Sequence, residues 1–163
     1  MKPINLPIFP LKLVVLPGTI QGLQIFEPRY LNMVKQCMSD ASNFVISYKS
    51  DRFDDFDFGI EKVGTSVQIV DFNNLPNGLL GITVKAESKV SLNNIIQLED
   101  KSYLGEVLPL TEPEVDDQSL LAKYPDLIEV LVKLKEHPEI KTLQLDIDLD
   151  SADSVSYLSL IHI

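Results

Sequence analysis

The stretch LQIFEPRYLNMV, residues 23–34, sets a charged pair around a proline within an otherwise apolar run. Proline disrupts helix interiors and central strands but is accepted at the first position of a helix. Pro28 therefore predicts a helix start, with Glu27 at or next to the N-cap, where the helix dipole favours a carboxylate. Helical spacing then predicts the apolar side of this helix: Leu31, Val34 and Met38, flanked by Tyr30 and Cys37. Arg29 and Asn32 are expected to lie off that side.

The residues before this stretch favour strands. LPIFPL (6–11) interleaves apolar residues with prolines, which suits an edge strand or the beginning of a sheet rather than a central strand. Pro17-Gly18 predicts a turn, and GLQIF (22–26) predicts a second short strand. The helix at Pro28 is therefore a strand-to-helix joint.

The residues after the helix also favour strands. NFVISYK (43–49) and YLGEVLPL (103–110) each predict one strand, and residues 64–92 predict a hairpin around Asn77-Gly78, a pair typical of positive-φ turns. The acidic, aromatic segment 50–64 lacks the ligand spacing of a calcium loop, so we expect a solvated loop that packs Phe56 or Phe58 onto the core.

Beyond the acidic linker TEPEVDDQ (111–118) the pattern becomes helical. The apolar stripe comprises Leu120, Leu121, Tyr124, Leu127, Ile128, Leu131 and Leu134. Pro125 should kink or restart this helix, and His137-Pro138 should end it. Asp150 or Ser151 is the expected N-cap of a last helix that begins near Ala152.

Composition limits the functional class. The 163 residues carry a formal charge of −10, which argues against nucleic acid as a partner because phosphate binding requires clustered Lys and Arg. No apolar run reaches the ~18 residues of a membrane span, and the start lacks a signal peptide. A single cysteine, Cys37, cannot form an internal disulfide, so a reducing cytoplasm is expected.

The sequence offers no catalytic constellation. His137 and His162 are the only imidazoles, and no phosphate-binding loop or nucleophile motif is present. Cys37 lies beside the apolar stripe and is expected to pack in the core. The alternating aspartates of LDIDLD (145–150) are expected to be solvated rather than to hold a cation. We therefore expect a protein that is not an enzyme, with no cofactor and no metal.

Two stretches together resemble the N-terminal domain of Lon proteases. One contains P-I-F-P-L, P-G and then I-F-E-P-R-Y leading into a helix, and the other is the G-T-strand-N-G-strand pattern of residues 64–92. The resemblance spans residues 5 to about 110, and the helical remainder is compatible with the C-terminal helices of that family. Ala86, Lys89 and Val90 depart from the Gly, Arg and aromatic residue that usually close the second stretch.

The resemblance implies an α+β fold, namely a PUA-like, partly closed β-barrel with one packed helix, followed by a small C-terminal helical bundle. The implied domains are 1–112 and 113–163. The ATPase and peptidase domains of Lon are absent from this sequence, so it looks like a stand-alone form of the domain. The ending LSLIHI resembles translated sequencing-adapter sequence, and we expect the last helix to be truncated.

The resemblance also implies a function. It indicates a non-catalytic module that recognises unfolded or apolar polypeptide segments or acts as a protein-interaction module, with protease or chaperone components as further partners. No membrane partner is expected, because no apolar run is long enough to span a bilayer. The motif positions that carry over as substrate-binding candidates are Phe26, Glu27, Arg29, Tyr30 and Asn32, with Arg29 anchoring a peptide carbonyl or carboxylate. Two alternatives stay open: a PUA-like RNA-binding module, and a regulatory domain that binds a small molecule.

Overall fold

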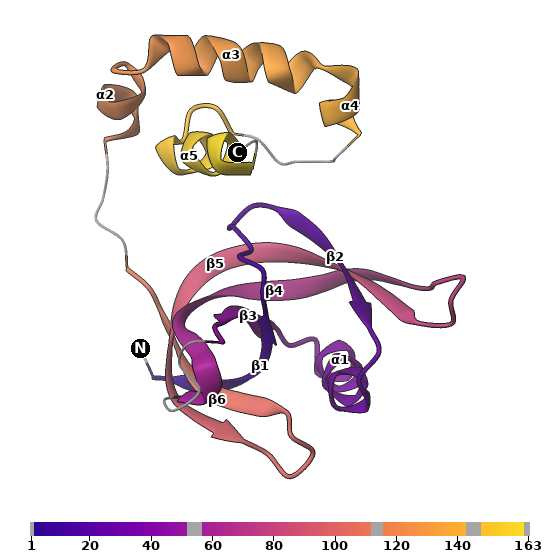
Figure 1. Ribbon diagram of the computed structural model, residues 1–163. Helices are drawn as coiled ribbons and strands as arrows, with labels where there is room; N and C mark the ends of the chain where they lie inside the picture. The colour runs from indigo at the N-terminus through magenta and orange to yellow at the C-terminus, as the bar shows by residue number, and fades with distance from the viewer. Residues whose placement is uncertain (1, 52–56, 112–115, 143–147, 162–163) are drawn as a thin grey trace. The chain divides into compact units, whose positions relative to one another are not determined.

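The computed structural model describes residues 2–51, 57–111, 116–142 and 148–161. The chain divides into two compact units, Met1–Leu110, which we call the β unit, and Thr111–Ile163, which we call the helical unit. Figure 1 shows the sheet and one helix in the first unit and the remaining helices in the second.

The β unit contains one six-stranded sheet that curves into a ring (Figure 1). Its strands are β1 (Ile4–Leu11), β2 (Ile20–Ile25), β3 (Phe44–Lys49), β4 (Ile60–Asn74), β5 (Leu80–Gln97) and β6 (Tyr103–Pro109). The order is β2-β5-β4-β3-β1-β6, and β6 pairs with β5 as well as with β1. That additional pairing closes the ring through β5, whereas β2 is attached to the first half of β5 outside it. The α+β fold with a partly closed barrel is confirmed.

The prediction that residues 6–11 form an edge strand or the beginning of a sheet, rather than a central strand, is met only in part. β1 lies between β3 and β6 in the sheet. Its first half, Ile4–Ile8, pairs only with β6, and its second half, Ile8–Leu11, pairs only with β3. Each half therefore has a partner on one side, and Pro7 and Pro10 lie in different halves. A proline, which lacks an N–H, is tolerated where one side of a strand has no partner. Because each half of β1 has one such side, β1 can contain two prolines although it lies between two other strands.

The helix α1 (Pro28–Asp40) begins as predicted, with Glu27 as the N-cap and Pro28 in the first turn. The predicted buried side is partly wrong. The buried residues are Tyr30, Met33, Val34 and Cys37, whereas Leu31 is half-buried and Met38 is 41% exposed. Apolar residues occur at 30, 31, 33, 34, 37 and 38, an arc wide enough to accommodate either orientation. Packing against the sheet selects the side centred on Val34, which is 1% exposed.

Two apolar clusters form the core of the β unit. The larger combines the buried side of α1 with residues of the sheet such as Phe9, Phe44 and Val84. The second is built around Ile8, Val45 and Leu92. Neighbouring residues of β1 and of β3 belong to different clusters, so both faces of these strands are buried, as their nearly continuous apolar sequences indicate.

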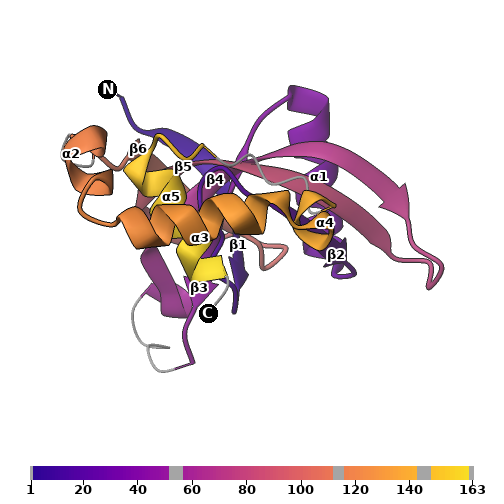
Figure 2. The ribbon, with the colours of Figure 1, turned by 90° about the horizontal axis from the view of Figure 1, so that it is seen from above.

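The predicted hairpin is confirmed and is longer than its motif indicated, because β4 and β5 pair from Asn74–Leu80 back to Val63–Ser91. Gly78 has a φ of 78°, and the Asn77 side chain accepts the N–H of Leu79 at 3.1 Å. Asn77 itself does not have the positive φ that was expected. Figures 1 and 2 show the tip of this hairpin extending away from the ring.

The loop before β4 contains a short 3₁₀ turn, Asp57–Gly59. The Phe58 ring lies 5.3 Å from the ring of Tyr103, between centroids, and Phe58 remains 39% exposed. Phe56 lies outside the described residues. One phenylalanine of the acidic loop therefore packs against the barrel as expected.

The helical unit contains α2 (Asp117–Leu121), α3 (Pro125–Glu136), α4 (Pro138–Lys141) and α5 (Ala152–Ile161). Pro125 restarts the helix and His137 follows the end of α3, as predicted. Ser151 caps α5 by accepting the N–H of Ser154 at 3.4 Å. The described core consists of Leu131 and Val155, with partly buried residues around them, and Tyr124 of the predicted stripe is exposed. Among the described residues, no helix is both long and apolar enough to span a bilayer.

Candidate functional site

The joint between β2 and α1 is held by an ion pair within the motif. Glu27 is in extended conformation, and its carboxylate does not cap the helix. Its Oε2 atom instead accepts Nε of Arg29 at 2.8 Å and lies 2.7 Å from Nη2 of the same guanidinium. Because both nitrogens contact one oxygen, the pair fixes the direction in which Arg29 leaves the first turn of α1.

Arg29 connects α1 to the turn between β5 and β6. Its Nη1 donates to the backbone carbonyl of Lys101 at 2.6 Å, and its guanidinium carbon lies 4.7 Å from the centroid of the Tyr30 ring. Lys101 has a φ of 68°, an unusual conformation for a residue with a side chain, and this bond helps to hold it there. Arg29 is therefore a structural tie as well as a surface group, with 25% of its side chain exposed.

Tyr30 supports this arrangement from the core. Its ring is 3% exposed and lies 4.3 Å from the ring of Phe9, between centroids. Burial raises the pKa of the Tyr30 phenol to about 12, so the hydroxyl stays protonated in the neutral pH range. The ring thus provides an uncharged surface on which the guanidinium rests.

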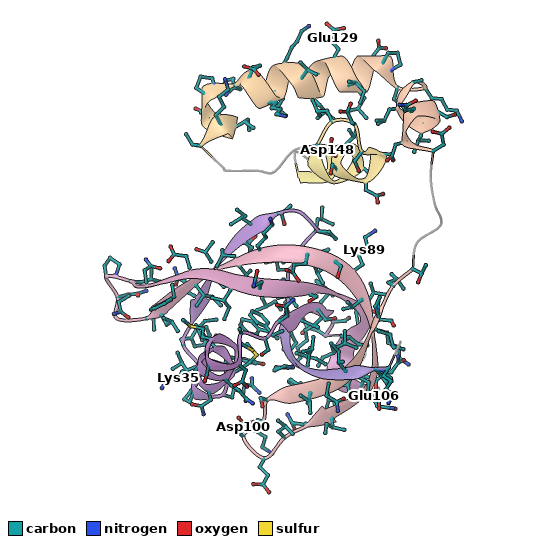
Figure 3. All side chains as sticks on the ribbon, turned by 180° about the vertical axis from the view of Figure 1, so that it is seen from behind. Lys35, Lys89, Asp100, Glu106, Glu129 and Asp148 are labelled. Atoms are coloured by element: carbon teal, nitrogen blue, oxygen red, sulfur yellow. The ribbon has the colours of Figure 1, made fainter. Side chains whose placement is uncertain are left out.

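Arg29 lines two neighbouring hollows. The larger, which we call the helix groove, has a volume of about 440 Å³ and lies between α1, β1 and the β5–β6 turn. Its polar lining includes Asn32, Gln36, Asp40 and Asp100, and its apolar lining includes Leu6, Pro7, Met33, Leu98 and Leu104. Figure 3 shows Asp100 at the tip of the β5–β6 turn, on the side of the barrel where α1 carries Lys35.

The smaller hollow, which we call the β2 hollow, has a volume of about 220 Å³. It is lined by the second half of β1, by Gln24, Ile25 and Phe26 at the end of β2, and by the first turn of α1. Phe26 is 66% exposed, an unusual position for a large apolar ring. Lys49 at the end of β3 also belongs to its lining.

The five residues proposed from the motif are thus distributed over the two hollows. Phe26, Glu27, Arg29 and Tyr30 line the β2 hollow, whereas Arg29 and Asn32 line the helix groove. Phe26, Glu27, Arg29 and Asn32 each expose side-chain surface that a ligand could contact, 38% of the side chain for Glu27 and 25% for Arg29, whereas Tyr30 is buried.

Sequence reasoning missed the β5–β6 turn. Asp100 accepts the backbone N–H of Ser102 at 2.9 Å and also its hydroxyl, and these two bonds hold the pKa of the Asp100 carboxyl below its usual range. Asp followed two residues later by Ser, between two apolar segments, is a recognisable signal for such a turn. Nothing in the sequence indicates that this turn meets α1, since Arg29 and Lys101 are 72 positions apart.

The cysteine and histidine that the structure describes have structural surroundings. Cys37, which borders the helix groove, is 2% exposed, and burial raises the pKa of its thiol, which disfavours the nucleophilic thiolate. His137 accepts the N–H of Glu139 at the start of α4, and His162 and Asp146 lie outside the described residues. Within the described ranges, no group of three His, Cys, Asp or Glu residues is arranged to hold a metal ion.

Comparison with known proteins gives consistent results. Residues 5–162 match the family model of the ATP-dependent protease La (LON) substrate-binding domain. The sequence is 30% identical over 155 residues to Lon protease 1 of Thermus thermophilus. The aligned region covers 88% of this chain but only 18% of the Thermus protein.

Solved structures of the same kind are similar to this fold. The crystal structure of a Lon N-terminal domain protein from Xanthomonas campestris has a TM-score of 0.69 and 27% identity, over 94% of this chain and 79% of that one. The N-terminal domain of Mycobacterium avium complex Lon protease has a TM-score of 0.65 over 97% of this chain and 96% of that one, and at 16% identity it bears on the fold alone.

Proposed function

The chain belongs to the LON substrate-binding domain family, and we propose that it binds unfolded or apolar polypeptide segments through the helix groove and the β2 hollow, without catalysing a reaction on them. The matched family describes a substrate-binding domain rather than a protease or ATPase domain. The activity of full-length Lon is not carried over, because the chain spans about a fifth of the relative that it matches.

The observation that supports this proposal is that two hollows with apolar lining meet at one guanidinium. Leu6, Leu98 and Leu104 in the helix groove and Phe26 at the β2 hollow can receive apolar side chains of a guest. Within the described ranges, three of the five N–H groups of Arg29 serve Glu27 and Lys101, which leaves two that can donate to a guest carbonyl. Asn32 is exposed beside it and can donate or accept.

A binding titration tests the proposal. Reduced, carboxymethylated α-lactalbumin, a soluble unfolded polypeptide, should bind with a dissociation constant in the micromolar range, because ordering the guest offsets much of the contact energy. Phe26→Ala should weaken binding roughly five-fold at little cost in stability. Phe72→Ala is the matched control, since Phe72 is also an exposed aromatic residue (57%) but lies on the β4–β5 hairpin.

Salt dependence distinguishes this function from RNA binding. Affinity for the polypeptide should change little between about 50 and 200 mM salt, whereas a single-stranded RNA oligonucleotide would lose affinity steeply over that interval as counterions are released. Salt-sensitive RNA binding tighter than polypeptide binding would overturn the proposal. Hydrolysis of ATP or casein that copurifies with the folded protein would contradict its non-catalytic part.

A further inference from the structure

β2 lies at the end of the strand order, so one of its two edges is open among the described residues. β2 pairs with β5 over six consecutive residues without a register shift, from Ile20–Lys85 to Ile25–Leu80. Among the described residues, no strand pairs with its other edge. Its sequence, IQGLQI, contains neither a charged residue nor a proline.

The other open edges in the described part of the sheet are protected. β1 carries Pro7 and Pro10 along its open edges. The outer part of β4 has a register shift between residues 69 and 71 and carries Asp71, and the end of β5 has a shift between residues 93 and 96. Prolines, charges and bulges are the usual devices that keep a strand edge from pairing with another chain. β2 has none of them.

The backbone groups that β2 presents outward can be identified. The N–H of Ala86 in β5 donates to the carbonyl of Thr19 at 2.9 Å, so the backbone of Thr19 points toward β5. Because an antiparallel ladder alternates bonded and unbonded positions, residues 21, 23 and 25 point their backbone groups to β5. Ile20, Gly22 and Gln24 then point theirs away from it. Consistent with this, the Gly22 carbonyl accepts the side chain of Gln21 at 2.9 Å rather than a strand partner.

We propose that an extended polypeptide segment adds to this edge as a further strand, bonded to the backbone of Ile20, Gly22 and Gln24, and continues into the β2 hollow. This inference rests on the proposed function and specifies how the guest is recognised. Backbone bonding accepts guests of many sequences, while the hollow at Gln24–Phe26 takes one side chain of the guest.

The geometry favours such a guest over a second copy of the chain. Six residues of strand span only about 20 Å, and a stable self-association needs about 800 Å² from each partner. A twofold pair of β2 strands would also place the two hollows at opposite ends of the pair, where neither strand enters the other's hollow. A flexible guest has no such restriction and can follow the edge into the hollow.

Amide hydrogen exchange measured by NMR, with and without carboxymethylated α-lactalbumin, tests the proposal at single residues. The amides of Ile20, Gly22 and Gln24 should exchange rapidly in the free protein and at least ten-fold more slowly with the probe bound. The amides of Gln21, Leu23 and Ile25 should be slow in both states, because β5 already bonds them. If the probe binds and the three outward amides are unchanged, strand addition is excluded while the proposed function stands.

A proline variant provides a second test with a matched control. Gly22→Pro removes one outward N–H and leaves the bonds to β5 in place, and it should weaken binding of the probe about three- to ten-fold. Gly22→Ala keeps the N–H, and its added Cβ meets no atom within 4 Å, so its affinity should stay within two-fold of the original. Equal affinities of two folded variants would overturn strand addition.

Two further outcomes complete the test. If the unaltered protein fails to bind the probe, the proposed function itself is wrong, and strand addition is wrong with it. If the outward amides are instead protected without probe, increasingly so with protein concentration, and sedimentation shows a dimer, the edge serves self-association and the polypeptide proposal is overturned.

Discussion

Among the residues whose burial the structure describes, the two units of this chain differ strongly in the size of their cores. In the β unit, α1 and the ring of strands bury two clusters that include Phe44, Ile8, Val45 and Val67 at 0% exposure. In the helical unit, the described cluster has two buried members, Leu131 and Val155. Charge differs as well. Residues 1–110 hold ten basic and twelve acidic side chains, whereas residues 111–163 hold four and twelve.

This difference indicates which unit is the more stable and bears on where the proposed binding surfaces lie. The β unit combines a closed hydrogen-bonded ring with a large core, so it can support exposed hollows and an open strand edge without losing its fold. The helical unit has short helices, a small core and acidic self-repulsion, all of which lower the stability of a packed helical structure. The described residues that line the two hollows of the candidate site all belong to the β unit.

The largest expected loss of stability follows from removing the aromatic side chain of Phe44 from the core of the β unit. Phe44→Ala should lower the free energy of unfolding by about 3–5 kcal/mol, because Phe44 is fully buried where α1 packs on the sheet. Urea unfolding followed by circular dichroism measures this. Hydrogen exchange should show faster exchange in β3 and β4 and unchanged exchange in α3. Equal loss of protection in α3 would mean that the units unfold together.

A pair of methionines on α1 tests the orientation of that helix. Met33→Ala should cost about 2–4 kcal/mol because Met33 is 5% exposed, whereas Met38→Ala, at a position 41% exposed, should cost less than about 1 kcal/mol. The two variants delete the same side chain from the same helix, so propensity effects cancel. Equal shifts of the urea midpoint would contradict the buried side described above.

Removal of the main core residue of the helical unit should have a smaller and local effect. Leu131→Ala should cost about 2 kcal/mol, the lower end for a buried leucine, because most of the described neighbours of Leu131 are only partly buried and can relax into the cavity. Faster amide exchange in α3 and α5, with β3 and β4 unchanged, is the expected result. Val132→Ala is the control, since Val132 is 44% exposed on the same helix. A loss of β-unit protection in Leu131→Ala would contradict independent units.

The smallest expected effect is on the pH dependence of stability and involves Tyr30, the residue whose ring contacts the Arg29 guanidinium. Burial raises the pKa of Tyr30 to about 12 in the folded protein, whereas an unfolded tyrosine titrates near 10. Between these values the unfolded state binds fewer protons, so the contribution of Tyr30 is complete below about pH 10 and is lost as the pH rises toward 12.

Tyr30→Phe keeps the packing against Phe9 and removes the titrating group. Its melting temperature should fall less than that of the original protein between about pH 9 and pH 11. The control is Tyr124→Phe, which deletes the same hydroxyl at a position that is 56% exposed in the helical unit. Identical alkaline profiles for Tyr30→Phe and the original protein would show that Tyr30 does not carry this dependence.

Much of the candidate site could be located from the sequence. Pro28 and Glu27 predicted the joint correctly because proline and capping effects act within one turn of chain. The sequence also identified Arg29 as the group to examine. It did not indicate the Lys101 carbonyl or the Asp100 turn, because closure of the ring through β5 and β6 brings them to α1.

The sequence by itself determined the order of the strands and of α1, α3 and α5, the turns at Pro17-Gly18 and Asn77-Gly78, and the restart at Pro125, because each depends on local backbone preferences of a few residues. It did not predict α4, which begins at Pro138. Only the tertiary structure decided the place of β1, the buried side of α1 and the open edge of β2. Pro7 and Pro10 exclude a partner on one side but do not specify which side, and the apolar arc of α1 admits two orientations. These choices depend on pairing and burial between residues far apart in the chain, whose free energies exceed local preferences.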